Sequence, residues 1–296
     1  MQKKLLGNRE LFLILFISLF FFSFKWILSF YFFSNEDLTI KVINDSSYSK
    51  DSFDSYSYFH YVKSLADFNF TSLYDKTLSS NYLISSPYGS NIIHSIFFRF
   101  IGVTGFIVSE YVFITSFFVI FFLIFRLINL SNNVCLFLVT FCFILPLIFK
   151  SLSYFEIREL KTLLDTFYGL RFPRPLVVNV YFYFFIYVLL NSHLNKNFFS
   201  IKNLCFFSIL LALTASSFFF FFINMFLCLL FYVLIEHKVQ IFNKIRENYK
   251  NIFLSILLFL ILISPFTILL IYSNPDYIQR MGVYEIDYRD KIFLIH

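Results

Sequence analysis

Apolar segments long enough to cross a lipid bilayer recur along this chain, and they limit the folds that are open to it. A transmembrane helix needs about 20 predominantly apolar residues, and runs of this kind include 11–33, 106–128 and 252–272. Hydrophobic residues make up 59% of the 296 residues and charged residues only 14%, whereas an ordinary globular domain is about 25% charged. A transmembrane β-barrel is excluded, because its strands alternate apolar and polar residues in segments of about ten. The sequence therefore predicts an all-α polytopic membrane protein.

Charge and cysteine placement exclude two further classes of function. The formal net charge is +6, and the basic residues cluster beside predicted spans, at the N-terminus and again over 238–250. Such clusters mark cytoplasmic loops of membrane proteins, so we expect no nucleic-acid partner. The 4 cysteines lie in apolar runs and lack the spacing of a zinc site or a redox motif. We expect them to be buried thiols.

The N-terminal part of the chain predicts one span followed by a large outer loop. The run 11–33 follows a basic N-terminus and has no small-residue cleavage site, so we expect an uncleaved anchor with a cytoplasmic N-terminus. Lys25, inside this run, is expected to extend its ammonium group to the outer interface. Residues 34–105 then form a large extracytoplasmic loop that contains amphipathic helices. One of these, at 91–103, is expected to lie at the membrane interface or to insert halfway.

The remaining spans occupy 106–272, so that 1–296 forms a single membrane domain with about six to seven transmembrane helices. The segment 203–235 is longer than one crossing needs, because a straight helix of this length spans roughly 50 Å against a hydrocarbon core of about 30 Å. The sequence "TASS" at 214–217 predicts a break into two helices, and a single tilted helix is the alternative. Residues 273–296 form an extracytoplasmic tail, whose apolar ending is expected of a protein that continues further.

Two aspartates in the first outer loop are candidate catalytic groups. Asp51 and Asp54 precede "SYSYFHYVKSL", in which Tyr58, Tyr61 and Leu65 recur at helical spacing. A carboxylate at the start of a helix is stabilised by the helix dipole and stays ionised. It can then accept a proton from a hydroxyl group or help to hold a divalent cation. A plain N-cap, satisfying backbone amides of the first turn, is the alternative for Asp54.

Two histidines fall in the same outer region. His60 and His94 have no third partner at the spacing of a metal site. We therefore expect each of them to form hydrogen bonds or to lie at the interface, and we predict no metal centre.

A second outer loop, at 150–175, ends in a pair of arginines beside prolines. Arg171 and Arg174 lie in "RFPRP", directly before the next span. A lipid-linked phosphate would lie at this level of the membrane, and arginine matches phosphate oxygens with two parallel hydrogen bonds. The prolines restrict the backbone and so pre-position the guanidinium groups. Non-specific anchoring to lipid head groups is the alternative, and it is favoured for Arg171.

A third cation, Arg280, lies in the outer tail beyond the last span. It is a further candidate for contact with a carrier phosphate. An ion pair with Asp287 or Asp290 is the alternative, and both readings stay open.

The order of these features resembles the GT-C superfamily of polytopic membrane glycosyltransferases. A basic-flanked span is followed by an outer loop with Asp and the aromatic-rich "FDSYSYFHYVKSL", then by "SSPYGSNIIHSIFFRFIGVTG" and a second full span. The resemblance implies an enzyme that transfers a sugar from a polyprenyl-phosphate-linked donor to an acceptor on the extracytoplasmic face. Asp54 is the best match for the catalytic base and Asp51 the second, since the family's usual Asp-Glu pair is absent here.

The resemblance also implies substrate-binding residues, partners and a location. The substrate-binding candidates are Tyr58, His60, Arg171, Arg174 and Arg280. The implied partners are the lipid-linked sugar donor and membrane lipids, in a multi-pass protein of the bacterial inner membrane. No particular cofactor is implied, and a divalent cation stays an open alternative.

A transporter or a flippase for lipid-linked saccharides is the main alternative. Transport uses ionisable groups or broken helices near the middle of the membrane. Charged residues are expected to avoid the span interiors here, so that only Lys25 and the break at 214–217 favour transport. A polysaccharide polymerase would have its large outer loop late in the chain, whereas this chain has it early.

Overall fold

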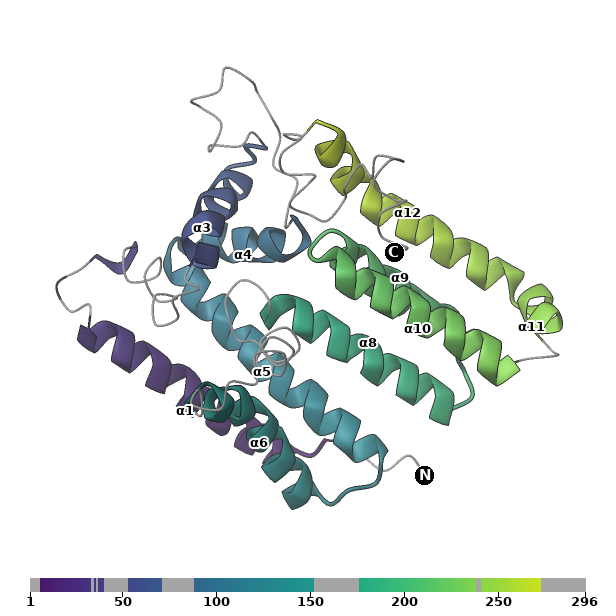
Figure 1. The fold of residues 1–296 in the computed structure, drawn as a ribbon, viewed down its shortest axis with the longest axis horizontal. Coiled ribbons are helices and arrows are strands. Elements are labelled where there is room, and N and C mark those ends of the chain that lie inside the picture. The colour runs from purple at the N-terminus through teal and green to yellow at the C-terminus, as the bar shows by residue number, and fades with distance from the viewer. Residues whose placement is uncertain are drawn as a thin grey trace, which may run out of the picture.

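The computed structural model describes residues 6–32, 35, 37–39, 53–70, 88–151, 176–237 and 241–272, and contains no strand in these ranges (Figure 1). Its helices are α1 (Asn8–Phe32), α3 (Phe53–Ala66), α4 (Tyr88–Ile101), α5 (Thr104–Leu127), α6 (Asn132–Ser151), α8 (Leu176–Leu194), α9 (Ile201–Ala215), α10 (Phe219–His237), α11 (Ile241–Glu247) and α12 (Tyr249–Ile271).

Four of the described helices, α5, α8, α10 and α12, are long and apolar enough to cross a membrane. Helix α1 covers the predicted first span, although the side chain of Lys25 lies outside the described residues. Helix α9 and the first part of α6 are shorter apolar helices. The prediction of an all-α membrane protein is confirmed, while the number of spans and the large outer loop stay predictions.

The predicted break in the segment 203–235 is confirmed. Helix α9 ends at Ala215 and α10 begins at Phe219. Ser216 and Ser217 donate their hydroxyl groups to carbonyls of the preceding turn, at 2.9 and 2.5 Å. Such side-chain hydrogen bonds satisfy carbonyls that a continuing helix would have used, and so they stabilise the end of α9.

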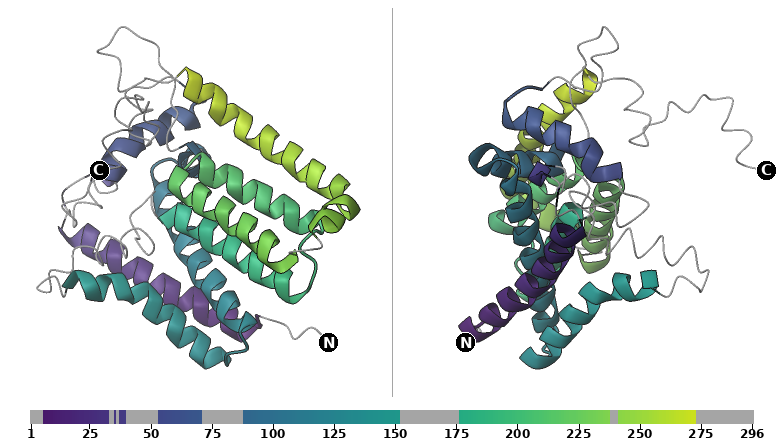
Figure 2. Two further views of the ribbon diagram at one scale, coloured as in Figure 1. Left: turned by 45° about the vertical axis from the view of Figure 1, so that its right-hand side comes forward. Right: turned by 90° about the vertical axis from the view of Figure 1, so that its left-hand side faces the viewer.

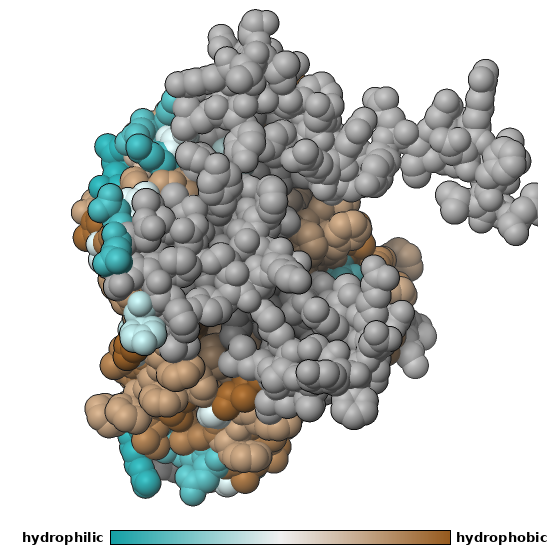
Figure 3. Space-filling view, turned by 60° about the vertical axis from the view of Figure 1, so that its left-hand side comes forward, coloured by the Kyte–Doolittle hydropathy of each residue, from teal (hydrophilic) through white to brown (hydrophobic). Residues whose placement is uncertain are grey.

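The bundle is centred on helices α5 and α9, which each pack against several other helices. Helix α5 packs against α1, α6 and α8, while α9 packs against α8, α10 and α12 (Figures 1 and 2). Helices α5 and α8 are about half buried within the protein, whereas α10 and α12 expose most of their apolar side chains. Figure 3 shows hydrophobic residues over the lower part of one face, with hydrophilic residues along one edge and at the bottom. Apolar side chains exposed in this way match a lipid environment.

Aromatic side chains fill the contacts between the central helices. Phe118 and Phe143 have ring centroids 4.9 Å apart, and Phe21 lies 5.0 Å from Phe143. Phe117 meets Tyr183 edge-on at 5.8 Å. Such edge-on and tilted pairs are favoured by the ring quadrupole, and they join α1, α5, α6 and α8.

One end of the bundle carries α3, α4, the α9–α10 turn and the start of α8; we call it the α4 end. The backbone amide of Gly89 in α4 donates to the Ser216 carbonyl at 3.0 Å. The Tyr181 hydroxyl of α8 donates to the Gly89 carbonyl at 3.3 Å. A Cβ added at Gly89 would lie 2.5 Å from the Leu213 carbonyl oxygen, so only glycine allows this close approach.

The opposite end carries the α5–α6 turn, the α8–α9 turn and the start of α12; we call it the basic end. The Asn132 side chain donates to Glu10 at 2.5 Å and brings the start of α1 to the α5–α6 turn. The Asn251 side chain donates to the Phe199 carbonyl at 3.1 Å and joins α12 to the α8–α9 turn. The described cations at this end are Arg9, Arg126, Lys196, Lys202, Lys244, Arg246 and Lys250.

Candidate functional site

Buried polar side chains gather at the α4 end of the bundle and form the first candidate site. We call them the polar set: Ser90, Asn91, His94, Ser95, Ser109, Glu110, Asn179, Ser216 and Ser217, all of them buried. Because buried polar groups are costly in an apolar environment, a concentration of them at one end of a membrane protein marks a candidate for function.

Helix α4 supplies the largest part of the polar set, because its polar face is turned into the protein. Asn91 and His94 are 0% exposed, whereas Phe100 on the opposite face is 80% exposed. In an aqueous protein the apolar face would be buried, but in a bilayer the lipid can solvate it while polar groups need protein partners. The prediction of an amphipathic helix is confirmed. His94 was expected to form hydrogen bonds or to lie at the interface, and its burial and its contact with Ser109 agree with the first of these two alternatives.

His94 packs among aromatic rings and forms one of the predicted hydrogen bonds. Its Nδ1 lies 3.1 Å from the Ser109 hydroxyl, and its ring stacks on Phe106 at 6.0 Å and meets Phe113 edge-on at 5.7 Å. Burial lowers the pKa of His94 to about 3, because the charged imidazolium would lose its hydration. His94 is therefore neutral at physiological pH.

Glu110 corrects the prediction that charged residues avoid the span interiors. This residue lies within α5 and is 2% exposed. The indole N–H of Trp26 in α1 donates to its carboxylate at 2.9 Å. The glutamate was visible in the apolar run that begins at Phe106, but its partner lies in a different helix, which no local pattern indicates.

Two buried polar side chains of α3 and α4 form no hydrogen bond with the described residues. Both the oxygen and the nitrogen of the Asn91 amide lack a partner, and so does the hydroxyl of Ser64, which is 3% exposed. Leaving such a group unsatisfied costs about 1–3 kcal/mol, so an unpaired buried amide in a folded protein calls for an explanation. An amide offers two donors and an acceptor, and these match the hydroxyl groups of a ligand.

Helix α3 holds the predicted catalytic segment against this end. Arg99 of α4 donates to the Ala66 carbonyl at 2.5 Å, and its guanidinium lies 4.5 Å from the centre of the Phe68 ring. Tyr61 and Leu65, predicted to recur on one helical face, are both buried and pack with Tyr88. The prediction of a helix after the aspartates is confirmed.

The predicted site residues themselves stay largely untested. Asp54, Tyr58 and His60 lie on α3, Asp54 in its first turn, but their side chains lie outside the described residues. The other four predicted residues, Asp51, Arg171, Arg174 and Arg280, also lie outside the described residues. The residue that follows Arg174 by two positions is described: α8 begins at Leu176, and its first turn is buried at the α4 end.

No metal centre is formed by the described side chains. Within the described ranges, no group of three His, Cys, Asp or Glu residues is placed to hold a metal ion. The four cysteines are free thiols. The prediction that they are buried is confirmed only for Cys135, because Cys142 and Cys205 are half-buried and Cys228 is exposed on α10. The polar set consists of neutral hydrogen-bonding side chains and one carboxylate, that of Glu110.

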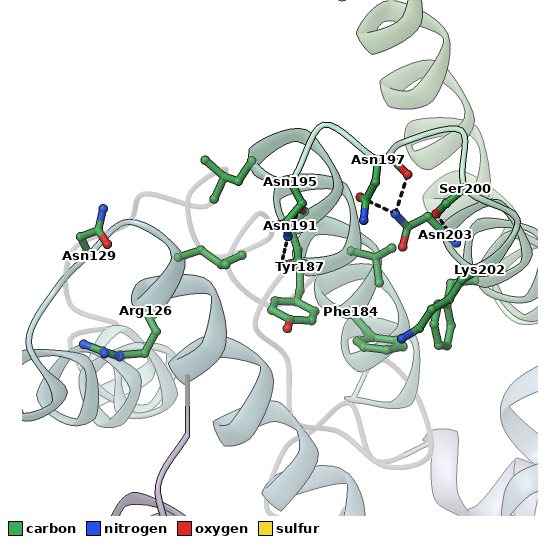
Figure 4. Close-up of a pocket in the computed structure, with 14 residues that line it drawn as sticks. Arg126, Asn129, Phe184, Tyr187, Asn191, Asn195, Asn197, Ser200, Lys202 and Asn203 are labelled. Atoms are coloured by element: carbon green, nitrogen blue, oxygen red, sulfur yellow. Dashed lines mark hydrogen bonds between the residues drawn. The ribbon is translucent and has the colours of Figure 1, made fainter. Parts of the chain in front are cut away.

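A cavity of about 1070 Å³ at the basic end is the second candidate site (Figure 4). It lies between the end of α5 and the α8–α9 turn and is lined by Arg126, Lys202 and several asparagines. No motif in the sequence predicts this site. The asparagine-rich turns "NLSNN" and "NSHLNKN" supply part of its lining, and they are the local feature that could have indicated it.

Both candidate sites are assembled from helices that are distant in the sequence. The polar set joins α1, α4, α5, α8 and the α9–α10 turn, and the cavity joins α5, α8 and α9. Comparisons with models of known protein families, with curated protein sequences and with solved structures found no match.

Proposed function

We propose that this chain is an integral membrane glycosyltransferase that moves a sugar from a polyprenyl-phosphate-linked donor to an acceptor on the extracytoplasmic face. One observation carries the proposal. Helix α3, with Asp54 in its first turn, packs on α4 at the end of the bundle where α8 also begins. The arginines at 171 and 174 precede α8 directly in the sequence, so the proposal assigns a carboxylate and two cations to this end.

The distribution of charge supports an extracytoplasmic α4 end. Cations that flank membrane spans are enriched on the cytoplasmic side. Most of the described cations lie at the basic end, among them Arg9, Lys202 and Lys250, whereas Lys63 and Arg99 lie at the α4 end. The predicted cytoplasmic N-terminus precedes α1 at the basic end. The α4 end then faces the compartment in which a lipid-linked sugar donor is presented.

The proposed chemistry uses these groups in complementary roles. The carboxylate of Asp54 accepts the proton of an acceptor hydroxyl while that oxygen bonds to the anomeric carbon of the sugar. The bond from this carbon to the carrier phosphate breaks, and the electron pair stays on the phosphate oxygen. Arg171 and Arg174 stabilise the charge that develops there. Asp51 is the second candidate for the base, and a divalent cation beside the carboxylates is an open alternative.

The orphan polar groups near α3 suggest how the sugar is held. The Asn91 amide and the Ser64 hydroxyl are buried and have no hydrogen-bond partner among the described residues, and sugar hydroxyls both donate and accept hydrogen bonds. Tyr58 and His60 on α3, with Arg280 in the tail, complete the proposed substrate contacts. The partners are accordingly a lipid-linked sugar donor and the surrounding lipids.

The decisive test is the transfer activity of Asp54→Asn in isolated membranes. The assay supplies undecaprenyl-phosphate-linked glucose, galactose and mannose with a labelled sugar and measures transfer to membrane acceptors. Loss of a general base reduces the rate by about 10²–10⁴-fold, while Asp51→Asn is the matched comparison. Unaltered turnover of Asp54→Asn would remove this residue as the base.

A second variant separates phosphate binding from anchoring. Arg174→Ala is expected to raise the donor concentration needed for half-maximal rate while the protein stays folded and abundant. A drop in protein abundance alone, with unchanged kinetics per molecule, would assign Arg174 to membrane anchoring.

A transporter or flippase for lipid-linked saccharides is the second candidate function, and two observations favour it. Glu110 is a buried ionisable residue within a candidate span, and a helix break separates α9 from α10. Ionisable groups and interrupted helices are typical of transport pathways. Under this function Glu110→Gln would abolish translocation of a fluorescent polyprenyl-phosphate lipid in proteoliposomes, while Asp54→Asn would leave it unchanged.

A further inference from the structure

The cavity at the basic end has the size of a site for a small organic ligand. Its volume of about 1070 Å³ is at the upper end of the range for such sites, which is roughly 300–1,000 Å³. It is therefore too large for a single inorganic ion. It lies at the opposite end of α5 and α8 from the polar set, so it is separate from the proposed transferase site.

The charge of the lining favours an anion. The 14 residues that line the cavity include Arg126 and Lys202 but no aspartate or glutamate. Neither cation forms an ion pair with a carboxylate in the described part of the chain. Figure 4 shows the two side chains on either side of Tyr187 and Phe184. Two unneutralised cations in a recess attract anions more strongly than the same charges on an open surface.

Arg126 is positioned to bind a ligand without rearranging. Its Nη1 donates to the Leu130 carbonyl at 2.5 Å, which fixes the guanidinium at the end of α5. A guanidinium that the protein holds at one nitrogen loses little side-chain entropy when its other N–H groups bind phosphate oxygens.

The α8–α9 turn beside the cavity is held in place by hydrogen bonds between its own asparagines. The Asn203 amide donates to the backbone and side-chain oxygens of Asn197, at 3.0 and 2.9 Å. The Asn195 amide donates in the same way to Asn191, at 2.8 and 3.0 Å. These bonds restrain the turn, so that the lining of the cavity is preorganised rather than formed on binding.

Apolar side chains complete the lining and suggest an amphiphilic ligand. Phe184, Phe206 and Val188 lie beside the polar groups in the same cavity. The cavity lies where the candidate spans α5 and α8 end, which is the level of phospholipid phosphates in a bilayer. A phosphate with an adjacent apolar or glycerol-like group fits this combination of charge, amides and rings.

We propose that the cavity at the basic end binds a phosphate-bearing anion, through Arg126 and Lys202. The side-chain amides of Asn191 and Asn197, whose nitrogens are not used in the bonds described above, are secondary donors. The same chemistry is available on an anionic phospholipid head group and on a soluble phosphate compound. This proposal does not depend on the transferase reaction, because none of its residues belongs to the polar set or to α3.

The test measures binding to the full chain in detergent micelles by microscale thermophoresis. The probes are dioctanoyl phosphatidylglycerol, which is anionic, dioctanoyl phosphatidylcholine, which has no net charge, and sodium pyrophosphate. The variants are Arg126→Gln and Lys202→Gln. The matched control is Lys196→Gln, which removes an exposed cation of the same turn that does not line the cavity.

The wild-type protein is expected to bind phosphatidylglycerol more tightly than phosphatidylcholine. Arg126→Gln is expected to weaken binding of the anionic probe by roughly tenfold or more, as for the loss of a charge-assisted hydrogen bond. Lys196→Gln is expected to leave the affinity within about a factor of two, as for a solvated surface charge. If Arg126→Gln does not fold, Lys202→Gln tests the same expectation at an exposed position.

The probes separate the two sources of the phosphate. Binding of phosphatidylglycerol alone assigns the cavity to a lipid head group, and binding of pyrophosphate as well assigns it to soluble phosphate compounds. Either result supports the proposal when the cavity variants weaken it. The proposal is overturned if neither anion binds the wild-type protein, or if Lys196→Gln weakens binding as much as the cavity variants do.

Discussion

Burial of His94 predicts that the protein loses stability in mildly acidic solution. The side chain is fully buried beside Phe106 and Phe113, and burial lowers the pKa of His94 to about 3. In the unfolded chain the pKa of a histidine is about 6.5. The perturbation that tests this difference is a change from pH 8 to pH 5, applied to the wild-type protein and to His94→Gln.

The sign and the size of the effect follow from proton binding. Between pH 6.5 and pH 3 the unfolded chain binds a proton at His94 that the folded protein does not bind. The free energy of unfolding therefore falls as the pH falls through this window, by about 1.4 kcal/mol per pH unit. The stabilisation is fully present above pH 6.5, and roughly 2 kcal/mol of it is lost by pH 5.

The assay is unfolding by titration with sodium dodecyl sulfate, followed by tryptophan fluorescence. The protein has 1 tryptophan, and Trp26 is 6% exposed in the bundle, so its emission reports on unfolding. Other groups also titrate between pH 8 and pH 5. The measured quantity is therefore the change in unfolding free energy of the wild-type protein minus that of His94→Gln.

The control is Asn195→Gln, which changes an exposed amide at the basic end and removes no titratable group. Its pH dependence is expected to match that of the wild-type protein. If His94→Gln loses as much stability on acidification as the wild-type protein does, then burial of His94 does not contribute to the pH dependence and the reasoning is refuted.

Three further substitutions probe the contacts that assemble the α4 end. Gly89→Ala is expected to reduce the free energy of unfolding by roughly 1–3 kcal/mol, because its Cβ would lie 2.5 Å from the Leu213 carbonyl oxygen. Glu110→Ala is expected to cost about 1–3 kcal/mol and to shift the emission of Trp26, since it removes the acceptor of the buried indole N–H. Arg99→Ala is expected to speed amide hydrogen exchange in α3, because it removes the hydrogen bond from Arg99 to the carbonyl of Ala66, the last residue of that helix. Exchange in α12 is expected to stay unchanged.

Matched controls distinguish these contacts from general damage. Gly102→Asn is expected to be nearly neutral, because Gly102 has open space around it and a φ of +62°, which asparagine tolerates. Glu110→Gln keeps an acceptor for the indole and should cost less than the alanine variant. Lys63→Ala removes an exposed cation of α3 and should leave its exchange unaltered. Equal effects of variant and control would contradict the corresponding assignment.

The positions of the helices could be predicted because they follow from local transfer energies. The runs around 106–128 and 252–272 are apolar enough that the summed transfer energies of their residues favour the membrane, independently of their neighbours in space. The break before Phe219 was also visible locally, because the serines of "TASS" bond to the backbone of their own turn. The helix that starts at Phe53 follows from the repeat of Tyr61 and Leu65 on one face.

The partners of these helices could not be predicted in the same way. Trp26 donates to Glu110 across 84 positions of sequence, and Gly89 meets the turn at Ser216, which belongs to a different part of the chain. Helix α1 is apolar on all sides, so no stripe of residues indicates which side faces a neighbour. Its rotation is decided by packing with α5 and not by composition.

The sequence alone determined that this protein is helical, where most of its apolar helices begin and end, and that one of its long apolar segments is broken. The tertiary structure decided which polar groups are buried together, at the α4 end around Asn91 and His94, and which cations share a cavity at the basic end. The physical reason is that insertion into a membrane depends on each segment by itself, whereas a binding site depends on contacts between segments that are remote in the chain.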